Sequence, residues 1–146
     1  MIKKECITEI HKAKSDHISW RANVQALVID VFIDPRQLPL VHTDSKFGQW
    51  YYGKGQELSS LNSYEALGAQ NEALHQAYMR LSKLYHSEPE SPSLFKSAIK
   101  IKEKKSQKIE ALHKEIMAIS KGLIATCNQL EREVKHLTDE ESQHIY

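Results

Sequence analysis

The chain contains 146 residues, of which 40% are hydrophobic and 27% are charged, and its formal net charge is +1. This length suits one domain with a modest core, and the near-neutral charge excludes a global field that would recruit nucleic acid or an anionic membrane. No run approaches the roughly 20 apolar residues that span a bilayer, and the first residues lack the apolar core of a signal peptide, so we expect a cytoplasmic protein without a nucleic-acid or membrane partner.

The first expected helix runs from about Lys4 to Phe32. Residues at three- and four-residue spacing predict its buried seam: Ile7, Ile10, His17, Val24, Leu27 and Val31. His17 has a member of this seam seven residues away on either side, so its ring is expected to face the core. The dipeptide Asp34-Pro35 is expected to end the helix.

The middle of the chain, residues 33–62, is expected to be mostly irregular. Asp44 or Ser45 is placed to cap a short helix that runs through Tyr52 and ends at Gly53.

A second long helix is expected to begin after Ser63, a residue suited to an N-cap. Its buried stripe is Tyr64, Leu67, Asn71, Leu74, Tyr78, Leu81 and Tyr85. Asn71 is the polar exception on this apolar stripe, and His75 lies one turn later beside the same face.

After a predicted loop at residues 87–92, residues 93–137 read as a third long helix, followed by a polar tail at 138–146. Its seam is Ile109, Leu112, Ile116, Ile119, Leu123, Leu130, Val134 and Leu137. A straight helix of this length would reach roughly 68 Å, about twice the preceding helix. Either it breaks near residues 102–106, or its end projects beyond the bundle. A projecting seam would need a partner, which favours a homodimer.

Two further features have modest interpretations. The lysine-rich stretch, Lys96 to Lys108, is interpreted as a solvated helix face rather than an anion site. Cys6 and Cys127 lie far apart, and neither belongs to a CxxC pair, so both are expected to be free thiols.

His17 and Asn71 are polar residues on otherwise apolar seams, and a buried polar group must find a partner. The simplest interpretation is a hydrogen-bonded network in the core, and the alternative is a metal site. The eight histidines in the chain are compatible with either.

Three motifs, in order and at matching spacing, resemble the chemoreceptor zinc-binding (CZB) domain family. They are His17-Ile18-Ser19-Trp20-Arg21, then Ser45-Lys46-Phe47-Gly48-Gln49-Trp50, then Asn71-Glu72-Ala73-Leu74-His75. The resemblance covers about residues 11–86. It implies an all-α fold, an up-down four-helix bundle, in which three histidines and one cysteine bind zinc. Such domains sit on chemoreceptors and diguanylate cyclases or occur alone, and they sense zinc or reactive oxidants.

Two of the four ligand positions implied by this resemblance are substituted. His17 and His75 stand at ligand positions, whereas Ser45 replaces the cysteine and Asn71 replaces a histidine. A neutral hydroxyl and an amide oxygen are weak zinc ligands, so zinc binding is expected to be reduced or altered. His42 is the best candidate for a substitute ligand, with Asp44 and Glu72 as further possible donors.

These observations predict one CZB-like domain at residues 1–137, acting as a stand-alone sensory or regulatory module in bacterial signal transduction. The expected partners are a second copy in a homodimer and a chemoreceptor or cyclase-type signalling protein. The alternative is a metal-free helical interaction bundle with a polar core at the former zinc site. Catalysis is not expected, because no nucleophile has a base at a recognisable spacing.

Overall fold

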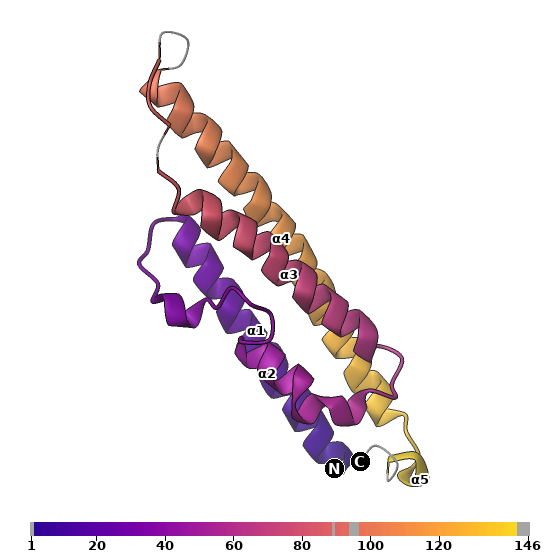
Figure 1. Ribbon diagram of the computed structural model, residues 1–146. Helices are drawn as coiled ribbons and strands as arrows, with labels where there is room; N and C mark the ends of the chain where they lie inside the picture. The colour runs from indigo at the N-terminus through magenta and orange to yellow at the C-terminus, as the bar shows by residue number, and fades with distance from the viewer. Residues whose placement is uncertain (1, 89, 94–96, 143–146) are drawn as a thin grey trace.

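The computed structural model describes residues 2–88, 90–93 and 97–142, and in this part of the chain every regular element is helical (Figure 1). The α-helices are α1 (Lys3–Val28), α2 (Lys46–Tyr52), α3 (Tyr64–Tyr85), α4 (Ala98–Lys135) and α5 (Asp139–Ser142). Successive helices from α1 to α4 run in alternating directions. The predicted all-α, up-down bundle is therefore confirmed, with three long helices and a short second one.

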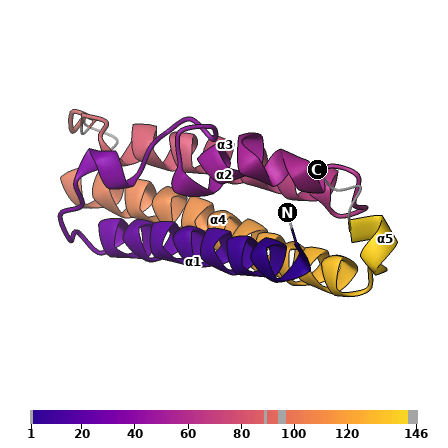
Figure 2. The same ribbon diagram turned by 90° about the horizontal axis from the view of Figure 1, so that it is seen from below.

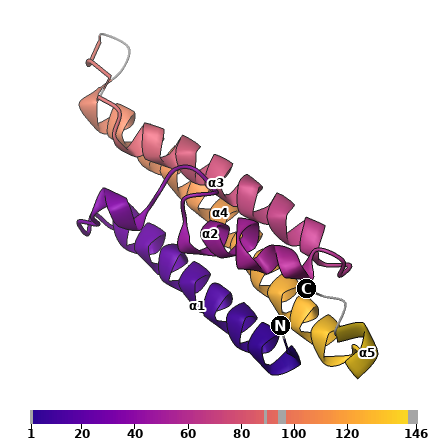
Figure 3. The same cartoon turned by 60° about the horizontal axis from the view of Figure 1, so that its bottom comes forward.

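Helix α4 is the central packing element, because it lies against both α3 and α1. Helix α2 packs on α1, and it lies with its flanking segments across the side of the bundle between α1 and α3 (Figures 2 and 3). The predicted seams supply one hydrophobic core, whose fully buried members include Ile10, Leu67, Leu74 and Leu123. The irregular middle of the sequence thus closes the bundle where a fourth long helix is missing.

Helix α1 ends earlier than the sequence predicts, at Val28 rather than near Phe32. Asp30 adopts a left-handed conformation with φ of 64°. Its N–H donates to the carbonyl of Leu27, and the N–H of Val31 donates to the carbonyl of Ala26. This paired arrangement satisfies the last carbonyls of a helix and stops it. The prediction that Val31 continues the buried seam is wrong, since its side chain is 47% exposed.

The expected stop signal at Asp34-Pro35 acts on a different element. The Asp34 side chain accepts a hydrogen bond from the Arg36 N–H at 2.9 Å and caps a single 3-10 turn, Pro35–Gln37. Helix α1 has already ended by this point, so the two signals are separate.

The start of α3 is held by a residue from another helix. Ser63 occupies the N-cap position as predicted, but its side chain does not cap its own helix. Instead, the Glu133 carboxylate on α4 accepts hydrogen bonds from the Ser63 N–H at 3.0 Å and from its hydroxyl at 2.5 Å. A carboxylate at a helix N-terminus also interacts favourably with the helix dipole.

Replacing Glu133 with alanine is expected to lower the free energy of unfolding by about 1 kcal/mol, the usual loss when a helix cap is removed. Urea unfolding followed by circular dichroism would measure the change. Glu110→Ala is the control, because Glu110 is an exposed acid on the same helix that pairs only with Lys114 among the described contacts. Equal losses in the two variants would contradict a capping role for Glu133.

Helix α4 is continuous over 38 residues, so the predicted alternative of a break near residues 102–106 is wrong. At 1.5 Å per residue it is about 57 Å long, compared with about 33 Å for α3. Its N-terminal part therefore extends past the end of α3, as the orange segment in Figure 1 shows. Ile99, in this projecting part, is 70% exposed, and the first buried residue of α4 is Ile116.

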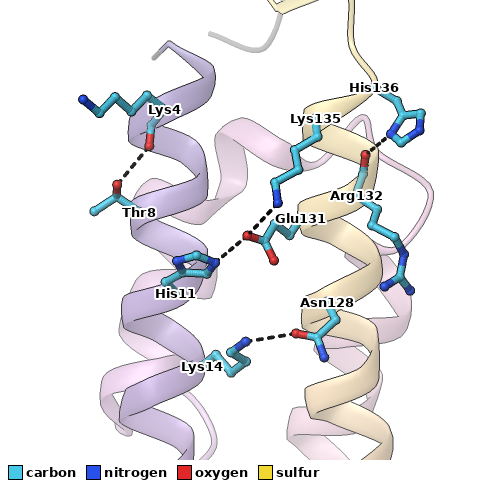
Figure 4. Close-up of polar contacts among 9 residues, drawn as sticks. All are labelled: Lys4, Thr8, His11, Lys14, Asn128, Glu131, Arg132, Lys135 and His136. Atoms are coloured by element: carbon cyan, nitrogen blue, oxygen red, sulfur yellow. Dashed lines mark hydrogen bonds and ion pairs between the residues drawn. The ribbon is translucent and has the colours of Figure 1, made fainter.

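At the opposite end, polar contacts join α1 to α4 (Figure 4). His11 Nε2 contacts Glu131, whose carboxylate also lies 3.4 Å from Lys135 Nζ, and Lys14 donates to the Asn128 side chain at 3.0 Å. Burial acts to raise the pKa of Glu131, but the hydrogen bond and charge of His11, together with Lys135, lower it overall. These contacts fix the alignment of the two helices.

Candidate functional site

The fold brings four motif positions, which lie far apart in the sequence, to one cavity of about 430 Å³. His17 from α1, Ser45 at the start of α2, and Asn71 and His75 from α3 all line it. All four side chains are at most 4% exposed. The expectation that His17 and Asn71 point into the core is confirmed, and the short α2 brings Ser45 to them.

His17 has a hydrogen-bond partner that the sequence reasoning missed. Its Nε2 lies 2.7 Å from the hydroxyl oxygen of Ser120, a fully buried residue of α4. The sequence spacing does indicate that Ser120 is buried, because this residue lies four residues after Ile116 and three before Leu123. A polar residue at seam spacing on α4 carries the same information as Asn71 does on α3.

Ser45 is occupied by a local structural role. Its side-chain oxygen accepts a hydrogen bond from the Gly48 N–H at 3.0 Å, which caps α2, and its hydroxyl is 3.4 Å from the His42 carbonyl. Of the two predicted caps, Ser45 is therefore the correct one, and Asp44 is not. A hydroxyl committed to an N-cap has little capacity left to bind an ion.

Asn71 connects α3 to the irregular segment. Its side-chain amide donates to the His42 carbonyl at 3.1 Å, while its own oxygen is buried without a partner among the described residues. His42 thus contributes its backbone, and its ring packs edge-on against Tyr52 with centroids 5.6 Å apart. The His42 ring does not line the cavity, so the structure does not bring this candidate ligand to the other four positions.

His75 is held mainly by aromatic packing. Its ring centroid lies 4.9 Å from that of Trp20, which also stacks on His17 at 6.0 Å. Trp20 therefore covers the two imidazoles, whereas Trp50 packs on Phe47. The Nδ1 atom of His75 is buried without a hydrogen-bond partner among the described residues.

Both imidazoles are neutral near pH 7. Burial, then the nearby charge of Arg21 and then His75, lower the pKa of His17 to about 4. Burial also lowers the pKa of His75 to about 4, although the backbone of Pro39 acts in the opposite direction. Burial disfavours the charged form of a histidine, so the cavity presents uncharged nitrogens.

The two thiols do not belong to this site. Cys6 on α1 and Cys127 on α4 are both free thiols, as predicted; both are buried, and neither lines the cavity. Burial raises the pKa of Cys127 to about 12 and also raises the pKa of Cys6. Thiols that remain protonated are poor nucleophiles and poor metal ligands.

The donor set does not fit a tight structural zinc site, which needs four nitrogen or sulfur donors in a tetrahedron. The His17 Nε2 and the Ser45 hydroxyl are already hydrogen-bonded within the protein. The atoms left over are the Asn71 oxygen and His75 Nδ1, which are both neutral. In the part of the chain that the structure describes, no three His, Cys, Asp or Glu residues are grouped closely enough to hold a metal ion.

No protein-family model, curated protein or solved structure matches this chain. The resemblance to CZB domains therefore rests on the three sequence motifs. Over the described residues, no helix combines the length and the apolar character needed to cross a membrane.

Proposed function

We propose that this protein is a CZB-like regulatory module of bacterial signal transduction in which a neutral, hydrogen-bonded polar core has replaced the zinc site. One observation carries the proposal: three of the four ligand-position side chains already form a hydrogen bond within the protein. His17 bonds to Ser120, Ser45 to the Gly48 N–H, and Asn71 to the His42 carbonyl.

The substitutions are physically consistent with one another. A thiolate in this cavity would be a buried negative charge, and it would be costly without a cation beside it. Serine and asparagine carry no charge, and neutral imidazoles need no counter-ion. Such a core ties α1 to α4 and α3 to the segment before α2 through directional hydrogen bonds, which is a structural basis for a bundle that acts through its contacts.

A second candidate function is zinc binding at reduced affinity, the role first expected from the motifs. The unpartnered Asn71 oxygen and His75 Nδ1 favour it, because both belong to side chains that line the same cavity. These atoms with His17 would supply three neutral donors, and His17 would first have to release Ser120. Of the two further donors considered from the sequence, Asp44 also lines the cavity and Glu72 does not. Weak binding is the most that this set supports.

We infer that the output of the module passes through its contacts with other proteins. A homodimer and a chemoreceptor or cyclase-type protein are the partners that the CZB resemblance implies. The part of α4 that extends past α3 supports an assembly role, because it exposes Ile99 in place of packing it.

Metal analysis separates the two candidates. We expect the untagged protein, purified without chelator, to contain no stoichiometric zinc by mass spectrometry and to keep its melting temperature after chelation. The double variant Ser45→Cys with Asn71→His restores the ligand types of the family, and it is expected to take up about one zinc ion per chain, because structural sites are closed by four such donors. His17→Ala with His75→Ala is the matched loss-of-ligand variant.

About one zinc ion in the unmodified protein, absent from the histidine double variant, would overturn the polar-core proposal in favour of weak or rearranged metal binding. Failure of the restored variant to bind zinc, if it folds normally, would contradict the CZB resemblance itself.

A further inference from the structure

One end of the bundle carries a groove of about 580 Å³, which is lined mainly by apolar residues, unlike the histidine cavity. It lies between the end of α1, the segment that follows it and the last turns of α3, and its lining includes Leu27, Val31, Leu38, Leu40, Tyr78 and Tyr85. Phe32 also lines it and is 86% exposed, with Ile29 beside it in the sequence at 72%. Exposed apolar side chains around a concave apolar surface are typical of an interaction site.

The projecting start of α4 brings unpaired positive charge to the same end. Between residues 97 and 109 the only acid is Glu103, and the lysines are Lys100, Lys102, Lys104, Lys105 and Lys108. Lys96 lies outside the described residues. Within the described residues, none of these five lysines forms an ion pair, whereas lysines elsewhere do, such as Lys54 with Glu9 and Lys135 with Glu131.

This lysine row is electrostatically unfavourable in the isolated chain. The lysines repel one another, and those in the first turns of α4 also lie at the positive end of the helix dipole. Negative charge from outside the chain would relieve both effects. An acidic partner would therefore gain more binding free energy at this row than a neutral partner would.

The lysine row lies at the same end of the bundle as the groove, although α4 itself does not line the groove. Lys105 Nζ donates to the Ser87 carbonyl at 3.1 Å, and the residue before Ser87, His86, lines the groove. Figures 1 and 3 place the start of α4, the end of α3 and the segment after α1 at one end of the molecule. The groove and the lysine row thus lie at one end of the bundle, and Lys105 ties α4 to the chain next to the groove.

We propose that this end of the bundle binds an acidic amphipathic helix of another protein, with apolar side chains in the groove and carboxylates along the lysine row. Apolar anchors at i, i+3 and i+4 with charges on the flanks are the usual form of helix-in-groove recognition. A second copy of this chain fits poorly, because it would bring a second lysine row against the first. Nucleic acid would use the lysines but not the apolar groove. The proposal extends the interaction role proposed above, but it does not depend on the polar core.

The test uses a fluorescein-labelled synthetic helix with leucine at i, i+3, i+4 and i+7 and glutamate on its flanks, measured by fluorescence anisotropy with the full chain. We expect saturable binding that weakens as salt is raised. Lys100→Gln, Lys104→Gln and Lys108→Gln together, and Phe32→Ser separately, are each expected to weaken binding by about tenfold or more. These side chains are exposed, so the variants should fold, which circular dichroism would verify.

Matched controls place the same changes elsewhere. Lys4→Gln, Lys12→Gln and Lys121→Gln remove the same charge from exposed positions outside the row, and Ile18→Ser changes an apolar residue of α1 that is 45% exposed. All four substitutions should leave binding unchanged. Equal losses in the controls, or binding of a peptide with lysine in place of glutamate, would overturn the proposal.

Two other outcomes would also overturn it. Binding of phosphatidylserine vesicles, with no binding of the acidic peptide, would assign the surface to a membrane. A dimer that dissociates in the Phe32→Ser variant, detected by analytical ultracentrifugation, would assign it to a second copy. Neither outcome changes the zinc content, so failure here is distinguishable from failure of the polar-core proposal.

Discussion

Replacing Gly48 with alanine is expected to destabilise the protein by about 3 kcal/mol, the upper end of the usual effect of overpacking a core. A Cβ at this position would lie 1.8 Å from the backbone oxygen of His42 and 3.1 Å from the Thr43 Cα. Backbone atoms cannot rotate away as a flexible side chain can, so the whole segment before α2 must shift.

The shift would also break the contacts that organise the cavity. The His42 carbonyl accepts the hydrogen bond from the Asn71 amide and lies 3.4 Å from the Ser45 hydroxyl. We therefore expect Gly48→Ala to loosen the attachment of α2 to α3 as well as to lower the free energy of unfolding. Urea unfolding measures the second effect, and hydrogen exchange at α2 measures the first.

Gly122→Ala is the matched control for this change. A Cβ at Gly122, inside α4, would meet only the Gln70 side-chain nitrogen at an ordinary distance of 3.5 Å. Because alanine favours a helix interior over glycine by up to about 1 kcal/mol, this variant is expected to be as stable as the unmodified protein or more so. A Gly48→Ala protein of unchanged stability would contradict the packing described for His42 and α2.

Stability is expected to fall as the pH falls from about 6.5 to 4, and to be nearly constant above 6.5. The pKa of both His17 and His75 is about 4 in the folded protein, compared with an ordinary value near 6.5 when the chain is unfolded. Between these pH values the unfolded chain binds more protons than the folded one, so protonation favours unfolding. The shift corresponds to about 3 kcal/mol for each histidine.

The free energy of unfolding, measured in urea at pH 7.5, 6.5, 5.5 and 4.5, checks this prediction. The double variant His17→Gln with His75→Gln separates these rings from other titrating groups, and its stability should depend much less on pH in the same range. Equal stability of the unmodified protein at pH 7.5 and 5 would mean that the two rings are not buried as neutral imidazoles.

Much of the candidate site was predictable because helix periodicity is local. Seven-residue spacing placed His17 on the buried face of α1, and the stripe on α3 placed Asn71 and His75 beside each other. The motif likeness then grouped Ser45 with them. All four meet at one cavity, as expected from these patterns.

The ligand chemistry of the site was less predictable, since it depends on atoms that no local pattern specifies. Whether the His42 ring or its carbonyl faces Asn71 is decided by the path of the irregular segment over the bundle. Ser120 had the right spacing on α4, but only the packing of α4 against α1 shows that His17 is its partner.

The sequence by itself therefore determined the helical class, the positions of α2 and α3, and the burial of His17 and Asn71, because each follows from the spacing of side chains along one helix. The tertiary structure alone decided where α1 ends, which carboxylate caps α3 and whether α4 breaks. Asp30 ends α1 through backbone bonds, Glu133 reaches Ser63 across 70 positions, and α4 stays continuous past its neighbours. The cap of α3 depends on a contact between distant segments, whose energy local spacing does not contain, and the end of α1 depends on a left-handed backbone conformation that the side-chain pattern does not specify.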